Sequence, residues 1–306
     1  MKIMRKLIIV IAAIVITGTI SAQQIPLYSQ YMFNKMLINP GYTGSEADIP
    51  VQLAVRQQWV GFEDAPSTQI LSGHYCFESY NMGVGAVLFV DRFGHERRIG
   101  FQANYSYILE VYEGTKLGLG LGLQVFQYQL NYDQLIALDD ADPNIIANVQ
   151  SKIVPESDFG AFLYNDTYFA GISANQMIGM PIKIGGEEMQ MSRLVRHYNL
   201  MGGYKFTLSP EFELEPSILA KTSFKAPSQL DVNLRGIYQK NYWLGLSYRT
   251  AGDIVTFLGL RFNEFDFGIA ADFATSDIAG YESGSYELML TYRIPVAPRS
   301  KGTSKY

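Results

Sequence analysis

The three histidines are the first residues to consider for catalysis or metal binding. His74 lies beside Tyr75 in a segment of alternating polar and apolar residues, His95 lies between two such segments, and His197 falls on a polar face. A catalytic or zinc-binding histidine needs a nucleophile, carboxylate or second ligand nearby. A Ser–His–Asn hydrolase would require a serine on a strand beside one of them, and no motif marks such a serine. We therefore expect solvated or interior histidines, no enzyme activity and no cofactor.

Two other stretches have some features of ligand sites. Asp139, Asp140 and Asp142, with Asn144 nearby, carry enough oxygen ligands for a calcium ion. Their spacing lacks the glycine that an EF-hand loop needs at its sixth position, so a solvated acidic loop is the better interpretation. The glycines between 118 and 122 alternate with leucines, and no helix or lysine follows them as in a phosphate-binding loop. We predict neither a metal site nor a phosphate site.

Charged residues gather on the polar faces of consecutive alternating segments. The members are Glu211, Glu213, Glu215, Asp231 and Arg235, with Lys205 and Lys221 nearby. Opposite charges on neighbouring strands can pair across a shared face. Ion pairs that close an interior are the preferred interpretation, and an ion-selective pore is the alternative.

These residues are positioned by segments in which side-chain character changes at every residue. From 117 to 125, leucine or valine alternates with glycine or glutamine. A period of two is typical of β-strands, whose side chains point alternately to opposite faces. Successive glycines on one face indicate a crowded or sharply curved wall. The expected strands are 51–59, 67–77, 81–91, 99–111, 115–130, 157–165, 167–176, 196–207, 211–222, 230–239, 241–250, 253–262, 265–273 and 285–294.

The strands predict an all-β fold, a transmembrane antiparallel β-barrel of about 14 strands, rather than a soluble sandwich. Apolar faces recur in nearly every segment of roughly ten residues, the length of a tilted membrane strand. Many of these faces begin or end in tyrosine or phenylalanine, as at a membrane interface. The chain has 21 Tyr, 18 Phe and 28 Gly. Past its N-terminus it has no apolar run of about 18 residues that would form a spanning helix.

The lengths of the connections predict the orientation of the barrel. Tight turns alternate with longer loops, and only 251–252 breaks the order. An even number of strands with this asymmetry places both termini and the tight turns in the periplasm. The loop 131–156 is long enough to be a functional candidate. The longer loops are expected at 60–66, 92–98, 131–156, 177–195, 223–229 and 274–284.

The N-terminus predicts export. Residues 1–6 carry three positive charges, residues 7–15 are uninterrupted apolar, and a stretch of small residues ends at Ala22. This pattern is typical of a secretory signal peptide, because the apolar run is too short to span a membrane. Cleavage changes the net charge from 24 − 29 = −5 to 21 − 29 = −8. An acidic chain argues against a nucleic-acid partner, and the single Cys76 excludes a disulfide framework.

The expected organisation has four parts. They are a signal peptide at 1–22, an N-terminal periplasmic or plug segment at 23–50, an outer-membrane β-barrel at 51–294 and a flexible C-terminal tail at 295–306. The segment 23–50 lacks alternation and contains turn chemistry at Asn39-Pro40-Gly41. It either crosses the lumen as a plug or lies along the periplasmic rim. We expect the protein in the cell outer membrane.

Three stretches of the N-terminal third are more specific. The first runs from 26 to 44 and contains PLYSQYMFN and INPGYTG, the second runs from 56 to 68 and contains RQQWVGF, and the third runs from 83 to 107 and contains DRFG. Together they resemble the PorP/SprF family of Bacteroidetes outer-membrane proteins. Gly41 and Thr43 replace two alanines that are usual in that family.

The resemblance implies a non-enzymatic barrel of the type IX secretion and gliding motility system. Its implied partners are a large secreted cell-surface protein such as an adhesin, type IX secretion components and outer-membrane lipid. Two alternatives stay open: an outer-membrane channel or transporter for small or hydrophobic compounds, and a barrel that braces the motility apparatus.

The same motifs supply candidate residues for a partner surface or a structural role. For Trp59 and Phe62 we prefer an aromatic girdle or loop anchor, and a partner-facing rim with Pro66 is the alternative. The candidates are Tyr28, Gln30, Tyr31, Asn34, Asn39, Pro40, Trp59, Gly61, Phe62, Pro66, Asp91 and Gly94.

Overall fold

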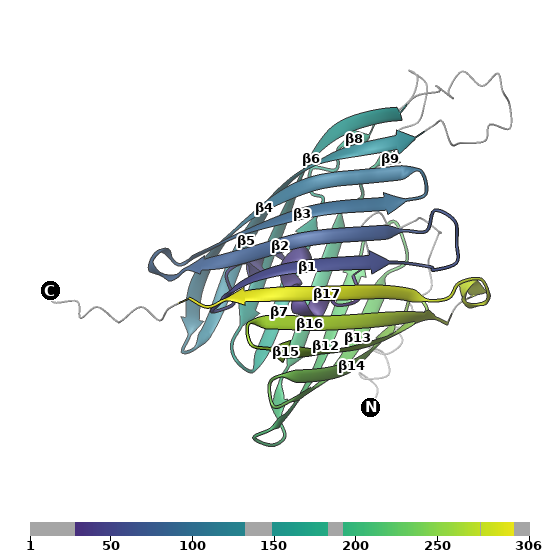
Figure 1. Cartoon of the computed structure of the whole chain (residues 1–306). Coiled ribbons are helices and arrows are strands. Elements are labelled where there is room, and N and C mark those ends of the chain that lie inside the picture. The colour runs from purple at the N-terminus through teal and green to yellow at the C-terminus, as the bar shows by residue number, and fades with distance from the viewer. Residues whose placement is uncertain (1–27, 132–148, 183–191, 276, 297–306) are drawn as a thin grey trace, which may run out of the picture.

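The computed structural model describes residues 28–131, 149–182, 192–275 and 277–296. In this part of the chain, fourteen antiparallel strands close into one barrel, because β10 pairs with β12 and β17 pairs with β1 (Figure 1). A closed barrel leaves no unpaired strand edge, as a lipid environment requires. The strands are β1 (Ile49–Gln57), β2 (Ser67–Phe77), β3 (Met82–Phe93), β4 (Glu96–Tyr112), β5 (Thr115–Asn131), β6 (Val149–Tyr164), β7 (Tyr168–Asn175), β10 (His197–Tyr204), β12 (Phe212–Thr222), β13 (Gln229–Tyr238), β14 (Tyr242–Arg249), β15 (Asp253–Phe262), β16 (Phe265–Ala274) and β17 (Ser285–Ile294).

The predicted fold class is confirmed, and each expected strand has its counterpart. The segments 67–77 and 253–262 begin and end where the alternation predicts. Three further strands are short: β11 (Phe206–Thr207) pairs with β12 of the barrel, whereas β8 (Pro181–Ile182) and β9 (Ser192–Arg193) pair with each other in a separate antiparallel sheet. No helix in the described ranges is both long and apolar enough to cross a membrane.

The two faces of the wall differ as a membrane barrel requires. On β14, the residues of one face are exposed and those of the other are buried, in strict alternation. The exposed set is Tyr242, Leu244, Leu246 and Tyr248, and the buried set is Trp243, Gly245, Ser247 and Arg249. An apolar outer face is suited to lipid, and polar side chains can then line the interior.

One expected loop is wrong. The segment 92–98 is a tight turn, because β3 and β4 stay paired as far as Phe93 and Glu96. Gly94, with a φ of 57°, supplies the left-handed conformation that a two-residue hairpin turn needs. His95 therefore lies in this turn and not in a long loop.

The start of β6 was also expected too late. This strand begins at Val149 and not at 157, because it pairs along the whole of β5 as far as Asn131. The acidic stretch from 139 to 144 lies outside the described residues. Loop lengths thus alternate with two exceptions, the turns at 94–95 and 250–252.

The described part of the N-terminal segment lies inside the barrel, where Figure 1 shows it in purple behind β1 and β17. We call residues 28–48 the plug. It contains three short 3-10 helices, η1 (Tyr31–Phe33), η2 (Lys35–Leu37) and η3 (Pro40–Tyr42). We call the end of the barrel with the loops 58–66 and 275–284 the loop end, and the end where β1 begins and β17 finishes the terminal end. The plug contacts β1, β16 and β17 near the loop end and reaches β1 at the terminal end.

The apolar core of the molecule lies in the lumen. Plug residues such as Tyr31 and Met36 pack in one buried cluster with inward side chains of the strands, among them Phe162, Leu219 and Phe257. Leu219 is an apolar residue on the otherwise polar inward face of β12. It is completely buried in this cluster, which explains why an apolar side chain stands at that position. The lumen is therefore a packed interior around the plug.

Glycines on the inner face of β5 make room for η3. A Cβ on Gly118 would lie 2.1 Å from the carbonyl oxygen of Gly41, and one on Gly120 would lie 2.2 Å from the carbonyl carbon of Pro40. Real Cβ atoms do not approach other atoms so closely, so a side chain here would displace the plug. The crowded wall expected from the alternating glycines is confirmed, and it is the plug that crowds it.

Gly120→Ala should destabilise the protein by about 1–3 kcal/mol, because the new methyl group overpacks the seat of η3. The measurement is the unfolding of the purified protein in detergent. The matched control is Gly202→Ala on β10, where a Cβ would meet only the Phe169 carbonyl oxygen at 3.6 Å. Equal stability of the two variants would show that the plug is not seated on β5.

Candidate functional site: the plug and the lumen around it

At the loop end, a buried cluster of charges holds the start of the plug. The backbone N–H groups of Ser29 and Gln30 donate to the Glu287 carboxylate over 2.8 and 3.0 Å. The Arg56 guanidinium lies 2.7 Å from the Asp272 carboxylate and 3.6 Å from that of Glu287, and it donates to Ser29 Oγ. All three charged side chains are almost fully buried. Removing one partner would leave a buried charge uncompensated, at a cost of about 3–5 kcal/mol.

The ion pairs continue around the inner wall from β16 to β12. Arg249 lies 3.4 Å from Asp272 and 3.5 Å from Asp231, and the Lys221 ammonium lies 3.5 Å from Asp231. The side chains of Arg249 and Asp231 are 1% and 0% exposed, so these charges depend on one another and not on water. The series of pairs joins β12, β13, β14 and β16.

A further charged group surrounds Lys35 of the plug. Arg235 on β13 lies 2.8 Å from Glu215 on β12, and both act on Lys35. Burial lowers the pKa of the Lys35 ammonium, and the charge of Glu215 opposes that change. The Glu215–Arg235 and Lys221–Asp231 pairs confirm the interior ion pairs expected on β12 and β13.

Asn39 fixes the middle of the plug. Its side chain is fully buried, and its Nδ2 donates to the carbonyl oxygens of Ala161 and Ile172 over 3.0 Å each. Its Oδ1 accepts from the Gly41 N–H over 2.9 Å. Pro40 is the first residue of η3, a position where a missing N–H leaves no hydrogen bond unmade. Asn39 therefore caps η3 and joins it to β6 and β7 at once.

At the terminal end, Arg293 of β17 holds the last residues of the plug. Its guanidinium donates to Glu46, lies 3.2 Å from Asp48 and lies 2.6 Å from Asp266 of β16. The Nε2 of His74 lies 3.7 Å from Glu46. Burial would raise the pKa of the Glu46 carboxyl, but His74 and Arg293 outweigh it and hold that pKa far below its usual range. Glu46 is therefore ionised at any ordinary pH.

The remaining candidate residues lie at the rim of the loop end. The loop 58–66 contacts the turn 94–95 through a hydrogen bond from the Gly94 N–H to the Asp64 carbonyl oxygen, 3.0 Å long. The rings of Trp59 and Phe93 meet there with their centroids 6.5 Å apart. Trp59 thus packs against Phe93 in this contact, whereas Phe62 is 41% exposed.

The structure therefore divides the candidates into two groups. The plug group is Tyr28, Gln30, Tyr31, Asn34, Asn39 and Pro40, and the rim group is Trp59, Gly61, Phe62, Pro66, Asp91 and Gly94. Of the two groups, only Tyr28 and Asp91 line a common cavity. Three residues that hold the plug were not expected from the sequence: Arg56, Asp272 and Glu46. The available signal was a charged residue on the inward face of a strand, for Arg56 and Asp272, or just before the first strand, for Glu46.

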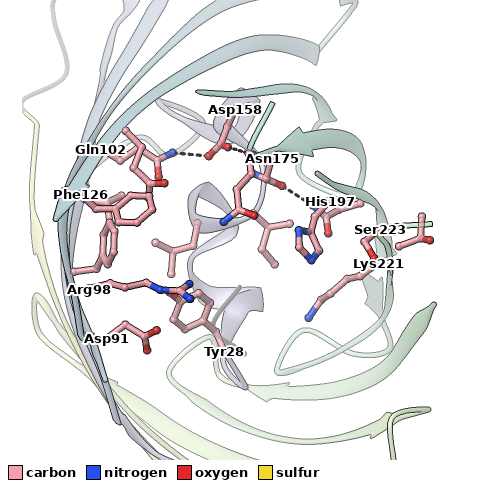
Figure 2. A pocket seen from close by; sticks show the side chains of 18 residues that line it. Tyr28, Asp91, Arg98, Gln102, Phe126, Asp158, Asn175, His197, Lys221 and Ser223 are labelled. Atoms are coloured by element: carbon pink, nitrogen blue, oxygen red, sulfur yellow. Dashed lines mark hydrogen bonds between the residues drawn. The ribbon is translucent and has the colours of Figure 1, made fainter. Parts of the chain in front are cut away.

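That cavity has a volume of about 110 Å³ and lies between the plug and the loop end. Figure 2 shows Arg98, Asp91 and Phe126 on one side of it, His197, Lys221 and Ser223 on the other, and Gln102, Asp158 and Asn175 between them. His74 and His197 are buried in the lumen. In the described ranges, no three His, Cys, Asp or Glu side chains gather as a metal site would require.

Comparison with solved structures shows the same kind of barrel. The chain is similar to the Ralstonia pickettii toluene transporter TbuX, with a TM-score of 0.52, 9% identity and coverage of 92% of this chain and 96% of that chain. It is also similar to a Pseudomonas aeruginosa FadL homologue, with a TM-score of 0.50, 10% identity and coverage of 89% and 95%. At such identities the likeness shows the fold alone. It confirms the predicted fold, that of an outer-membrane barrel.

Comparison by sequence shows the family. No curated protein matches the chain. The family model described as type IX secretion system membrane protein PorP/SprF matches residues 20–292, which is nearly the whole chain. The resemblance of the three N-terminal stretches is thereby confirmed, and the chain belongs to the PorP/SprF family of type IX secretion system membrane proteins.

Proposed function

We propose that this barrel is a non-enzymatic scaffold of type IX secretion that holds a large exported protein, such as an adhesin, at the cell surface. The observation that carries the proposal is the plug, which is tied to the wall at both ends of the lumen. The Ser29 and Gln30 N–H groups donate to the buried Glu287 carboxylate at the loop end, and Glu46 forms an ion pair with Arg293 at the terminal end. A barrel whose interior is occupied in this way is better suited to present a surface than to conduct a solute.

The loop end offers a folded surface for such a partner. The strands β4, β5 and β6 have 17, 17 and 16 residues, more than the roughly ten that cross a membrane. They therefore extend the wall beyond the lipid, on the side where Figure 1 shows β8 and β9. Ile182 of β8 and Leu194 pack against Phe126 and Val154 of this wall. Since longer loops of such barrels face outward, we expect this surface outside the cell.

Transport of small or hydrophobic compounds is the alternative. Two of the similar structures are a toluene transporter and a FadL homologue. At about one-tenth identity, what those proteins transport does not carry over to this chain. For this chain, transport would require the plug to leave Arg56 at one end or Arg293 at the other. Departure at the loop end would take two N–H donors from the buried Glu287 carboxylate, and departure at the terminal end would separate Glu46 from Arg293.

Deletion of the gene should leave general secretion intact and remove one large protein from the cell surface. The scaffold retains that protein, so its loss follows from the loss of the docking surface. Surface proteomics of the deletion strain and of the complemented strain measures the effect. An unchanged surface proteome would contradict the proposal.

The purified protein should show no steady conductance in planar bilayers. Arg293→Ala frees the terminal end of the plug and should raise the open time about tenfold, which corresponds to about 1.4 kcal/mol. Arg92→Ala, which removes an exposed charge near the loop end, is the control. Steady conductance of the unaltered protein would favour the transport alternative.

The contact of Glu46 with Arg293 at the terminal end of the plug should not depend on pH between about 8 and 5. The pKa of Glu46 is lower in the folded protein than the unfolded value of about 4.3. Its ion pair with Arg293 therefore contributes fully above that value and is lost as the pH falls from it through the lower pKa of the folded protein. Conductance recorded across this range tests the point, and opening at pH 6 would show that another group holds the plug.

A further inference from the structure

The outer part of β6 has a neighbouring strand on only one side. From Val149 to Tyr164, β6 pairs with β5 along its whole length, but its pairing with β7 begins only at Phe159. In the described part of the chain, no strand lies beside the segment 149–156 on its second side. Closure of the barrel removes unpaired edges where the strands cross the lipid, and β6 keeps one where it extends past β7.

The backbone groups that point to this free edge can be identified. The Ser157 carbonyl oxygen accepts from the Met177 N–H over 2.9 Å, so the backbone of Ser157 faces away from β5. Backbone groups alternate between the two sides of a strand, and those of Pro155, Ile153 and Ser151 therefore face away from β5 as well. Pro155 agrees with this direction, since it has no N–H to donate to β5. Among the described residues, the N–H and carbonyl groups of Ser151 and Ile153 have no partner on this side.

The free edge lies just beyond the apolar band that faces the lipid. On the outer face of β5, the apolar series ends at Val125, and Gln127 and Gln129 follow. Val125 lies beside Pro155, and Gln127 lies beside Ile153. An unpaired N–H group in lipid would be costly, and Pro155 at this boundary has none. The free donors begin with Ile153, which lies past the boundary at the loop end.

The side chains of the edge also favour an added strand. Natural proteins protect a free edge with outward lysine or with proline. Here Pro155 protects one position, and the other outward positions hold Ser151 and Ile153. Lys152 points inward, where its Nζ donates to the Pro181 carbonyl oxygen over 3.3 Å. The Ile153 side chain is 69% exposed, and a strand added beside β6 could cover it with an apolar side chain of its own.

A second copy of the barrel does not fit this edge. Two β6 edges would pair antiparallel about a twofold axis perpendicular to the wall. That axis lies in the plane of the membrane, so the second barrel would be upside down. Parallel pairing needs a twofold axis along β6, and because strands of such barrels are tilted by about 35–45°, the second barrel would be tilted by about 70–90° from the first. Copies that share one membrane therefore cannot pair through β6.

We propose that the outer edge of β6 binds an extended segment of the exported partner as an added β-strand, hydrogen-bonded to the backbone of Ser151 and Ile153 and packed with an apolar side chain against Ile153. In this mode of recognition, main-chain hydrogen bonds supply the affinity and alternate side chains supply the specificity. The inference rests on the proposed function, because it names how the partner is held.

Two substitutions at one position test the backbone contact. Ser151→Pro removes an N–H that has no partner among the described residues, so the barrel should keep its stability while an added strand loses a donor. Affinity purification of the barrel from detergent-solubilised membranes should then recover about tenfold less of the surface protein that the gene deletion removes. Ser151→Ala keeps the N–H and, as the matched control, should recover that protein in full. Equal recovery with both variants, at unchanged unfolding in detergent, would overturn the proposal.

Photocrosslinking in living cells identifies the occupant of the edge without a change to the backbone. Benzoylphenylalanine in place of Ile153 is compared with the same residue in place of Leu119, which is 45% exposed on the apolar outer face of β5. We expect a crosslink from position 153, and none from position 119, to the surface protein that the gene deletion removes. Absence of this crosslink, or crosslinks from position 153 only within the same chain or to a second copy of the barrel, would contradict the assignment.

The outcomes distinguish this inference from the proposed function. If deletion removes the surface protein, but the Ser151→Pro barrel recovers it in full and position 153 gives no crosslink to it, the β6 edge is not the binding site and the scaffold stands. If deletion removes no surface protein, the scaffold fails, and the added strand fails with it.

Discussion

The contact between the plug and the inner wall is the constraint on which the rest of the structure depends. Without Ser29 and Gln30, the buried Glu287 carboxylate would lose two N–H donors, and without Glu46, Arg293 would lose its closest acidic partner. Without η3, Gly118 and Gly120 would face a void. A buried charge or polar group that loses its partners is expensive. The barrel and its N-terminal segment are therefore one folded unit and not a pore with a loose insert.

This contact accounts for the residues that characterise the N-terminal third. The stretch INPGYTG is the part of the plug that packs against Gly118 and Gly120 of β5. Asn39 in this stretch donates hydrogen bonds to both β6 and β7. Position 41 has glycine where the family usually has alanine. Even one methyl group would lie 2.6 Å from the Gly118 carbonyl oxygen. The motif and the inner wall are thus complementary in shape, although they lie far apart in the sequence.

The sequence predicted the wall better than it predicted what the wall encloses. A period of two is a local signal, so strands such as 67–77 were found to the residue. The end of β3 and the start of β6 were missed, since β-pairing with a long neighbour extended them past their own alternation. The alternating glycines indicated crowding, but the element that causes it lies about 80 residues earlier in the chain. Arg56, Asp272 and Glu287 come from three strands, and only closure of the barrel brings them to Ser29.

Photocrosslinking in living cells tests most directly whether the loop end of the plugged barrel holds an exported protein. A photoreactive residue at Phe62, on the exposed rim of the loop end, is compared with one at Tyr112, which is 76% exposed at the opposite end. The account predicts a crosslink between position 62 and one large exported surface protein, with none to that protein from position 112. A crosslink from position 112 alone, to a periplasmic component, would contradict it and favour a barrel that braces the secretion apparatus.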